Sequence, residues 1–260
     1  MPRDPTKIKH LLRALDHLGV SLDYFALDLC LPELQRSVGI LCSEGFTHVC
    51  CHGLLGTYDD LRAWVQLPEN VQRSKCMISL GSSIGNLRPP EAVDFLSGYA
   101  EILRRSGPPL EEHQAQPKTL FIIGLDSCKS AETIYRAYND LGGANARFNM
   151  NSLDHANQVL GYKAFRTEEW TVQGEWDERA RCFSHSLVPL RDVMFEGVFL
   201  KVGEKVHISH SYKYDAIQKA RLWQQAGLRE MAAWRCKDPS YGETPFHPFG
   251  PIGCNRKLAA

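Results

Sequence analysis

The fold is decided by residues 76–87, which read CMISLGSSIGNL. The first half is a short apolar run typical of a buried strand, and the second half is a turn of glycines and small hydroxyls that reaches Asn86. A helical pattern follows from Glu91. In open α/β sheets, a strand, turn and helix of this kind place ligands at the carboxyl end of the strand. The alternative, a plain β-α turn with an Asn cap, stays open for this segment alone.

Further apolar runs alternate with helical patterns around this segment. Strands are predicted at 24–29, 46–51, 75–80 and 119–126, and helices at 8–18, 31–40 and 92–103. The last strand is the near-continuous apolar run that is typical of a central parallel strand. Residues 52–60, which read HGLLGTYDD, are predicted as a glycine loop that enters a helix. The alternation predicts an α/β protein with a doubly wound, Rossmann-like parallel sheet.

The pattern changes after Asp126. Helices are predicted at 131–141 and from about 149 to 160, followed by antiparallel strands and a last helix. Those strands are placed at 170–172, 180–189 and 198–214, and the helix at 215–227. Residues 107–118 are predicted as a polar surface insertion, and the tail from Asp238 shows no clear strand.

Charge and composition argue against several classes of protein. The 30 basic and 30 acidic side chains give a formal net charge of zero, so neither nucleic acid nor a membrane surface is expected as a partner. No apolar run has the length of a membrane span, and a cytoplasmic location is predicted. The nine cysteines form no CxxC pair, which predicts reduced, buried thiols. The histidines have no ligand spacing, so no metal site is expected.

The polar residues near the predicted loops suit binding better than bond cleavage. No nucleophile elbow, P-loop or zinc-protease motif is present, and no catalytic residue is assigned. Tyr58, Asn86 and Tyr138 can position an amine, and methyl transfer to a neutral amine needs mainly alignment and a cofactor. Asp28 ends a strand where a carboxylate suits a ribose diol, although it can equally cap the next turn. His52 is interpreted as a loop histidine rather than a base.

Six motifs in order resemble the histidine-specific, S-adenosylmethionine (SAM)-dependent methyltransferase family. That family includes histidine Nα-methyltransferases of ergothioneine synthesis and fungal 4-dimethylallyltryptophan N-methyltransferases. The motifs lie at 24–34, 53–60, 80–87, 124–129, 136–140 and 211–214, and the resemblance runs from about residue 7 to 228. It implies a class I methyltransferase sheet with an antiparallel α+β substrate or lid region, and SAM as cofactor.

The resemblance also implies cofactor contacts. Asp28 would bind the ribose, Thr57 and Tyr58 would lie by the adenine, and Gly81 would let the cofactor approach the backbone. Lys7 is the fifth implied contact. Asp126 and Lys213 are interpreted more simply, as a turn cap and as a solvated charge in a strand.

Four acceptor contacts are implied, and one of them departs from the family. Asn86 and Tyr138 would hold the α-amino and carboxylate end of a small-molecule amine, with Ser209 and Ser211 beside them. Histidine-specific members carry an imidazole-binding Glu where this chain has Ser209. Losing that carboxylate favours another amine, such as the tryptophan derivatives of alkaloid and other secondary metabolism.

Both ends of the chain also depart from the family. Residues 1–6 stand in place of a glycine-rich first loop but contain no glycine, and 238–260 replace a last apolar strand. We therefore expect a sheet that is truncated at the N-terminus, with marginal stability and weak or absent cofactor binding. The predicted parts are a SAM-binding part at 1–130, a substrate or lid region at 131–237 and an irregular tail at 238–260.

Two functions follow from this resemblance. The first is a SAM-dependent N-methyltransferase acting on the amine of an amino acid or a derived metabolite. The alternative is a non-catalytic remnant or regulatory protein of the same fold. A nicotinamide oxidoreductase is disfavoured because no GxGxxG follows a first strand.

Overall fold

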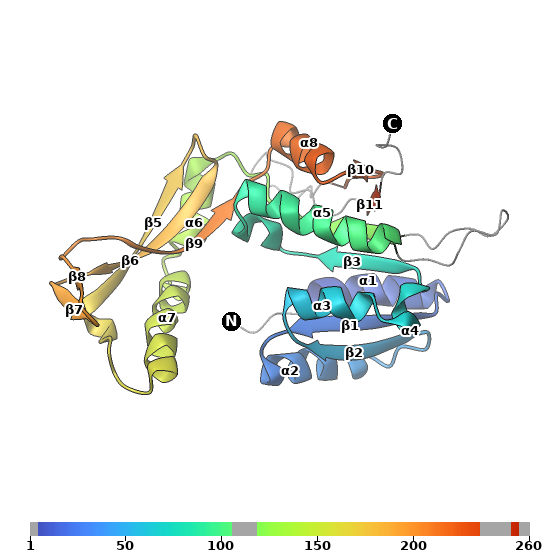
Figure 1. The fold of residues 1–260 in the computed structure, drawn as a ribbon, viewed down its shortest axis with the longest axis horizontal. Helices are drawn as coiled ribbons and strands as arrows, with labels where there is room; N and C mark the ends of the chain where they lie inside the picture. Colours follow the sequence, from blue (N-terminus) through green and yellow to red (C-terminus); the bar gives the residue numbers. More distant parts are fainter. Residues whose placement is uncertain (1–4, 106–118, 235–250, 255–260) are drawn as a thin grey trace. The chain divides into compact units, whose positions relative to one another are not determined.

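The computed structural model describes residues 5–105, 119–234 and 251–254 (Figure 1). Contacts group these residues into two compact units. The first unit holds 5–75 and 101–105, and the second holds 76–100, 119–234 and 251–254. The functional division at residues 130 and 237 stays a prediction, and the expected insertion at 107–118 lies outside the described residues.

Within residues 5–75, the first unit is built on a pair of parallel strands. These are β1 (Leu22–Asp28) and β2 (Val49–Leu55), which pair in register from Leu22↔Val49 to Asp28↔Leu55. The helices are α1 (Thr6–His17), α2 (Leu31–Cys42), α3 (Tyr58–Val65) and α4 (Pro68–Val71). The α/β alternation predicted from the sequence is therefore confirmed in this unit.

The glycine loop predicted at 52–60 is shorter than expected, because its first residues belong to β2. A Cβ at Gly53 would lie 3.1 Å from Leu34 Cγ of α2, so this glycine lets the helix pack on the strand. The loop begins at Gly56 and ends in a capping box. The Asp60 amide donates to Thr57 Oγ1 (3.1 Å), and the Thr57 amide donates to Asp60 Oδ2 (2.7 Å).

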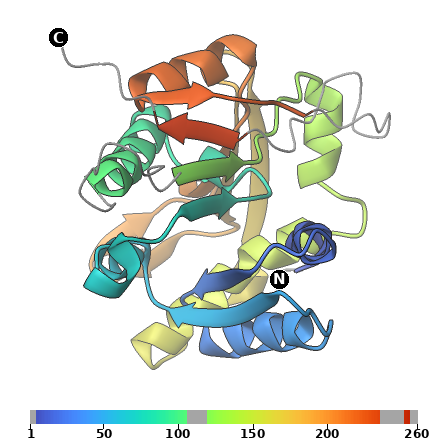
Figure 2. The same cartoon turned by 90° about the vertical axis from the view of Figure 1, so that its right-hand side faces the viewer.

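The second unit contains a sheet with the strand order β10-β11-β4-β3 in the described chain (Figure 2). Its strands are β3 (Lys75–Ser79), β4 (Thr119–Ile123), β10 (Leu228–Glu230) and β11 (Pro251–Cys254). The Gly124 amide donates to the Ser79 carbonyl (2.9 Å), so the carboxyl ends of β3 and β4 lie side by side. β11 runs antiparallel to both neighbours and lies within the tail for which the sequence predicts no strand.

A second, antiparallel sheet in this unit has the order β5-β6-β9. Its strands are β5 (Trp170–Asp177), β6 (Cys182–Pro189) and β9 (Val206–Tyr212), and a small hairpin joins β7 (Val193–Phe195) to β8 (Val198–Leu200). The helical segments of the described chain after residue 80 are η1 (Ser83–Asn86), α5 (Pro89–Arg105), α6 (Ala131–Tyr138), α7 (Ala144–Leu160), η2 (Thr167–Glu169) and α8 (Ala216–Gln225). The antiparallel α+β region is thereby confirmed. Leu153, Trp170 and Leu187 form one of its buried clusters.

The cysteines differ from the sequence-based expectation. The seven cysteines within 5–105 and 119–234 are free thiols, but only Cys182 is buried. Four are exposed and two are partly buried, so the prediction of buried thiols is wrong for most of them. For Cys50 in β2 and Cys76 in β3, apolar neighbours did not secure burial, because strand residues alternate between two faces. In the part of the chain that the structure describes, no helix is long and apolar enough to cross a membrane.

Candidate functional site

Three of the predicted cofactor residues share one edge of the first unit. Asp28 is the last residue of β1, and Thr57 and Tyr58 follow the end of β2. The Gly56 amide donates to the Asp28 carbonyl (3.1 Å), which ties the two strand ends together. The carboxyl edge of a parallel pair is where α/β sheets bind ligands.

These residues also serve the local fold. Asp28 Oδ1 accepts a hydrogen bond from the Cys30 amide (3.0 Å), so this carboxylate does cap the turn into α2. The polar atoms of Thr57 are used in the capping box of α3, whereas the Tyr58 side chain is 51% exposed at the start of that helix. Lys7 lies in the first turn of α1 with an exposed side chain. Asp28 and Tyr58 therefore offer the groups that a ribose and an adenine need.

Gly81 belongs to the turn after β3, in the second unit. Gly81 and Ser82 both have left-handed backbones, with φ of 77° and 61°. The buried Ser82 hydroxyl accepts from the Asp126 amide (3.0 Å), which joins this turn to the end of β4. A Cβ at Gly85 would lie 2.6 Å from the Tyr212 carbonyl oxygen, so η1 packs directly on β9. Asn86 ends η1 and is exposed.

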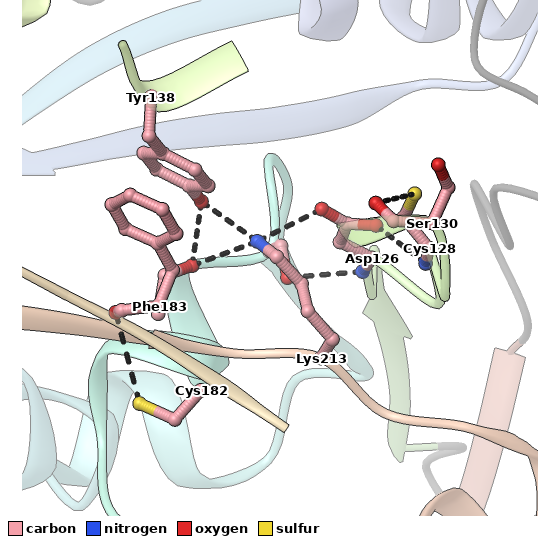
Figure 3. A network of polar contacts seen from close by, with 9 residues as sticks. Asp126, Cys128, Ser130, Tyr138, Cys182, Phe183 and Lys213 are labelled. Atoms are coloured by element: carbon pink, nitrogen blue, oxygen red, sulfur yellow. Dashed lines mark hydrogen bonds and ion pairs between the residues drawn. The ribbon is translucent and has the colours of Figure 1, made fainter. Parts of the chain in front are cut away.

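A partly buried polar cluster brings two predicted acceptor residues together (Figure 3). Tyr138 ends α6, and its hydroxyl donates to Ser211 Oγ on β9 (2.8 Å). Lys213 Nζ donates to Tyr138 Oη (2.7 Å) and Ser211 Oγ (3.0 Å) and forms an ion pair with Asp126 Oδ2 (2.9 Å). We refer to these four residues as the Tyr138 cluster.

The cluster corrects the interpretation of one residue and extends that of another. Lys213 is 3% exposed, so the prediction of a solvated charge is wrong. Its ammonium is instead surrounded by acceptors, as a buried charge requires. Asp126 does cap its turn, since the Cys128 amide donates to Oδ1 (2.9 Å), but its second oxygen pairs with Lys213.

Aromatic contacts fix the Tyr138 ring. It stacks on Phe183 of β6, with centroids 4.5 Å apart and planes 15° from parallel. Lys213 Nζ lies 4.7 Å from the Tyr138 centroid, within the range of a cation–π contact. A Cβ at Gly174 on β5 would lie 2.7 Å from the Phe183 ring, so the glycine makes room for this stack. The Tyr138 hydroxyl is therefore fixed in two ways: its ring is stacked on Phe183, and its oxygen is hydrogen-bonded to Ser211 and Lys213.

Ser209 lies two residues before Ser211, on the same face of β9, and its hydroxyl contacts the imidazole of His185. His185 Nδ1 lies 3.2 Å from Ser209 Oγ, and Asn145 Nδ2 lies 2.9 Å from His185 Nε2. Since the Asn145 amide group donates, Nε2 accepts and the ring proton belongs on Nδ1. Burial lowers the pKa of His185, so the ring is neutral near pH 7. Sequence reasoning missed His185 and Asn145, although alternation along β6 could have indicated His185.

The electrostatics of the cluster favour binding over proton abstraction. Burial alone lowers the pKa of Lys213, but the Asp126 carboxylate and the Tyr138 oxygen outweigh it and hold that pKa above its ordinary value. Burial also raises the pKa of neighbouring Tyr214 to about 12. The cluster therefore presents a protonated lysine beside two hydroxyls, which can hold and orient an anionic or polar ligand group.

Comparison with known proteins gives a family match over most of the chain. Residues 4–246 match the family described as histidine-specific, SAM-dependent methyltransferase. Ergothioneine biosynthesis protein 1 of Neurospora crassa is 39% identical over 88% of this chain and 25% of its own length. N-methyltransferase imqF of Aspergillus flavus is 30% identical over 91% of this chain and 63% of its own length. The chain thus spans a quarter of the first relative and less than two thirds of the second.

One further relative and one solved structure complete the comparison. The 4-dimethylallyltryptophan N-methyltransferase easF of Aspergillus fumigatus is 31% identical over 89% of this chain and 68% of its own length. A crystal structure of a SAM-dependent methyltransferase from Clostridium acetobutylicum covers 97% of this chain and 92% of its own, with a TM-score of 0.42 and 10% identity.

Proposed function

Because this chain belongs to the histidine-specific, SAM-dependent methyltransferase family, we propose that it methylates the amine of an amino acid or of an amino-acid-derived small molecule. The observation that carries the proposal is the Tyr138 cluster, in which two predicted acceptor residues meet within hydrogen-bond distance. Their hydroxyls suit the carboxylate of an amino acid, with Asn86 as a further contact. SAM supplies the methyl group and its leaving group when bound.

The residues at the carboxyl edge of β1 and β2 fit the cofactor. Asp28 has the carboxylate that a ribose diol needs, and the exposed Tyr58 ring can lie against an adenine. We keep Lys7, Thr57 and Gly81 as proposed contacts. For Thr57 the contact would come from its surface rather than its hydroxyl, because the capping box uses that hydroxyl. A cytoplasmic location is also proposed, supported by the free thiols of the described cysteines.

The contacts of Ser209 favour an acceptor other than histidine. This position carries a hydroxyl that bonds to the neutral His185 ring, and a hydroxyl binds an imidazole less strongly than a carboxylate does. We therefore propose a tryptophan-derived amine as the preferred acceptor. The family description names histidine and the name of the easF relative contains 4-dimethylallyltryptophan, so the preference rests on Ser209 and not on overall identity.

The test begins with calorimetric titration of the chain with S-adenosylhomocysteine. As an enzyme, the chain should bind with micromolar affinity, which is tighter than the weak or absent binding expected from the sequence. Asp28→Asn should weaken this binding at least tenfold, because the variant keeps the acceptor for the Cys30 amide but removes the charge. Asp23→Asn on the same strand is the matched control, since Asp23 bonds to His52 and Arg73 at the surface. Its binding is expected to equal that of the parent.

Methyl transfer is then measured with histidine, tryptophan and 4-dimethylallyltryptophan. We expect transfer to at least one amine, with a tryptophan-derived acceptor preferred over histidine. A folded chain that neither binds S-adenosylhomocysteine nor methylates any of them would contradict the enzyme and support the non-catalytic alternative. Transfer to histidine alone would contradict the proposed acceptor preference.

A further inference from the structure

We propose that Lys213 and Asp126 are positioning residues for the acceptor: they orient the Tyr138 and Ser211 hydroxyls so that one O–H points out of the cluster toward the acceptor's carboxylate. The identity of that ligand rests on the proposed function. The ammonium itself is buried, so it acts through the two hydroxyls.

A count of hydrogens carries the argument. An ammonium has three N–H donors and accepts nothing. The donors of Lys213 are matched by Tyr138 Oη, Ser211 Oγ and Asp126 Oδ2, at 2.7, 3.0 and 2.9 Å. Both hydroxyl oxygens therefore accept from the lysine and share one further hydrogen bond with each other (2.8 Å).

One hydroxyl hydrogen is left over from this arrangement. The bond between the hydroxyls uses the Tyr138 hydrogen, so the Ser211 hydrogen points out of the triangle. If the two hydroxyls exchange roles, the Tyr138 hydrogen is left instead and the count is unchanged. Because the lysine supplies only donors, the cluster as a whole presents a donor, and a hydrogen bond to a carboxylate is stronger than one to a neutral amide oxygen.

Asp126 keeps this geometry fixed. Its amide donates to Ser82 Oγ (3.0 Å), its carbonyl accepts from the Tyr214 amide (2.8 Å), and its Oδ1 accepts from the Cys128 amide (2.9 Å). The remaining oxygen is therefore held at one position and aims Lys213 at the hydroxyls. Groups held in place before a ligand arrives bind it at a lower entropic cost.

The test compares a carboxylate with an amide on the same amino acid. L-Tryptophan, L-tryptophanamide, L-histidine and L-histidinamide are titrated into the parent and into Lys213→Met, with and without S-adenosylhomocysteine. The parent should bind at least one free acid tenfold or more tightly than its amide, and Lys213→Met should lose that preference. S-Adenosylhomocysteine affinity should not change in the variant.

Two further variants separate this role from a purely structural one. Lys219→Met removes another partly buried lysine of the same unit, which pairs with Glu230 (2.8 Å), and should keep the carboxylate preference. If Lys213 acts through the two hydroxyls, then adding Lys213→Met to Tyr138→Phe/Ser211→Ala should lose no more preference than Tyr138→Phe/Ser211→Ala alone. Lys213→Gln, which keeps a polar side chain without the charge, replaces Lys213→Met if the latter does not fold.

The outcomes are distinct. A parent without a preference for either free acid overturns the inference. So does a lysine variant that keeps the preference, or a Lys213→Met effect that persists in the Tyr138→Phe/Ser211→Ala background. A parent that shows the preference but does not bind S-adenosylhomocysteine contradicts the proposed function and leaves the inference standing.

Discussion

The two units hold their candidate binding groups in contrasting ways. At the edge of β1 and β2, Asp28 and Tyr58 are accessible, and the neighbouring hydroxyl of Thr57 serves a helix cap. In the second unit, Tyr138 and Ser211 belong to a partly buried network around a buried lysine. Binding to the first unit must order exposed side chains, which costs entropy. A ligand of the second unit instead contacts side chains whose positions are already fixed.

The ion pairs follow the same contrast. In the first unit, Asp23 contacts both His52 (3.0 Å) and Arg73 (2.9 Å), and all three side chains are more than a third exposed. In the second unit, the Lys213 side chain is 2% exposed where it pairs with Asp126. Exposed pairs contribute little to stability, while removing one partner of a buried pair leaves an uncompensated charge.

The largest expected effect is therefore the loss of Lys213. Lys213→Met should lower the free energy of unfolding by about 3 kcal/mol, because the Asp126 carboxylate is left without its charge partner. Arg73→Met in the first unit should cost less than about 1 kcal/mol. Urea denaturation of the two variants and the parent measures both values, and equal costs would contradict the contrast.

Two glycines provide the next comparison. Gly85→Ala should destabilise the chain by about 1–3 kcal/mol, because the new Cβ would lie 2.6 Å from a carbonyl oxygen of β9. Gly39→Ala, in α2, meets open space and should stabilise the chain by roughly 0.5–1 kcal/mol through helix propensity. Thermal unfolding distinguishes these opposite signs. A stable Gly85→Ala would show that η1 does not pack closely on β9.

The two units should also differ in how their contributions to stability depend on pH, although this effect is smaller. The raised pKa of Lys213 means that its contribution to stability is complete below its ordinary value of 10.5 and is lost as pH rises through the folded-state pKa. The stability difference between the parent and Lys213→Met should therefore stay level near neutral pH and shrink only above 10.5. Denaturation across alkaline pH checks this, and a difference that already shrinks near pH 8 would contradict a buried, paired ammonium.

The first unit should respond at the opposite end of the scale. Hydrogen bonding by His52, and secondarily Arg73, holds the pKa of Asp23 below its ordinary 3.8. Its contribution is present above that value and is lost as pH falls below it. Asp23→Asn should therefore match the parent in acid and differ slightly at neutral pH. A larger difference in acid than at pH 7 would reverse the sign and contradict the assignment.

The sequence predicted what depends on local pattern and missed what depends on distant partners. Apolar periodicity located β1, β4 and α5, but β10 and β11 are too short to show a period. In the sequence, Lys213 resembles a surface lysine of the predicted strand at 198–214. In the structure it follows the end of β9, and its burial follows from Asp126 and Tyr138, which are remote in the sequence.

Glycines in the candidate motifs were also hard to interpret. Gly53 and Gly85 lie in segments that resemble ligand loops, yet their missing side chains make room for Leu34 and for β9. Only a structure distinguishes a glycine that admits a ligand from one that admits a neighbouring element. Asp28 and Asp126 were hard to interpret for a similar reason. One oxygen of a carboxylate can cap a turn while the other binds a ligand or pairs with a charge, so a capping role does not exclude a second role.

The most direct test of the account is amide hydrogen exchange of the parent, measured with each ligand separately. S-Adenosylhomocysteine should slow exchange most at residues 28–30 and 56–58, and L-tryptophan should slow it at the end of α6 and in β9 around Ser211. This result would place the cofactor on the first unit's edge and the acceptor on the Tyr138 cluster. Unchanged exchange at 28–30 and 56–58 with saturating S-adenosylhomocysteine, or tryptophan protection confined to the first unit, would contradict the account.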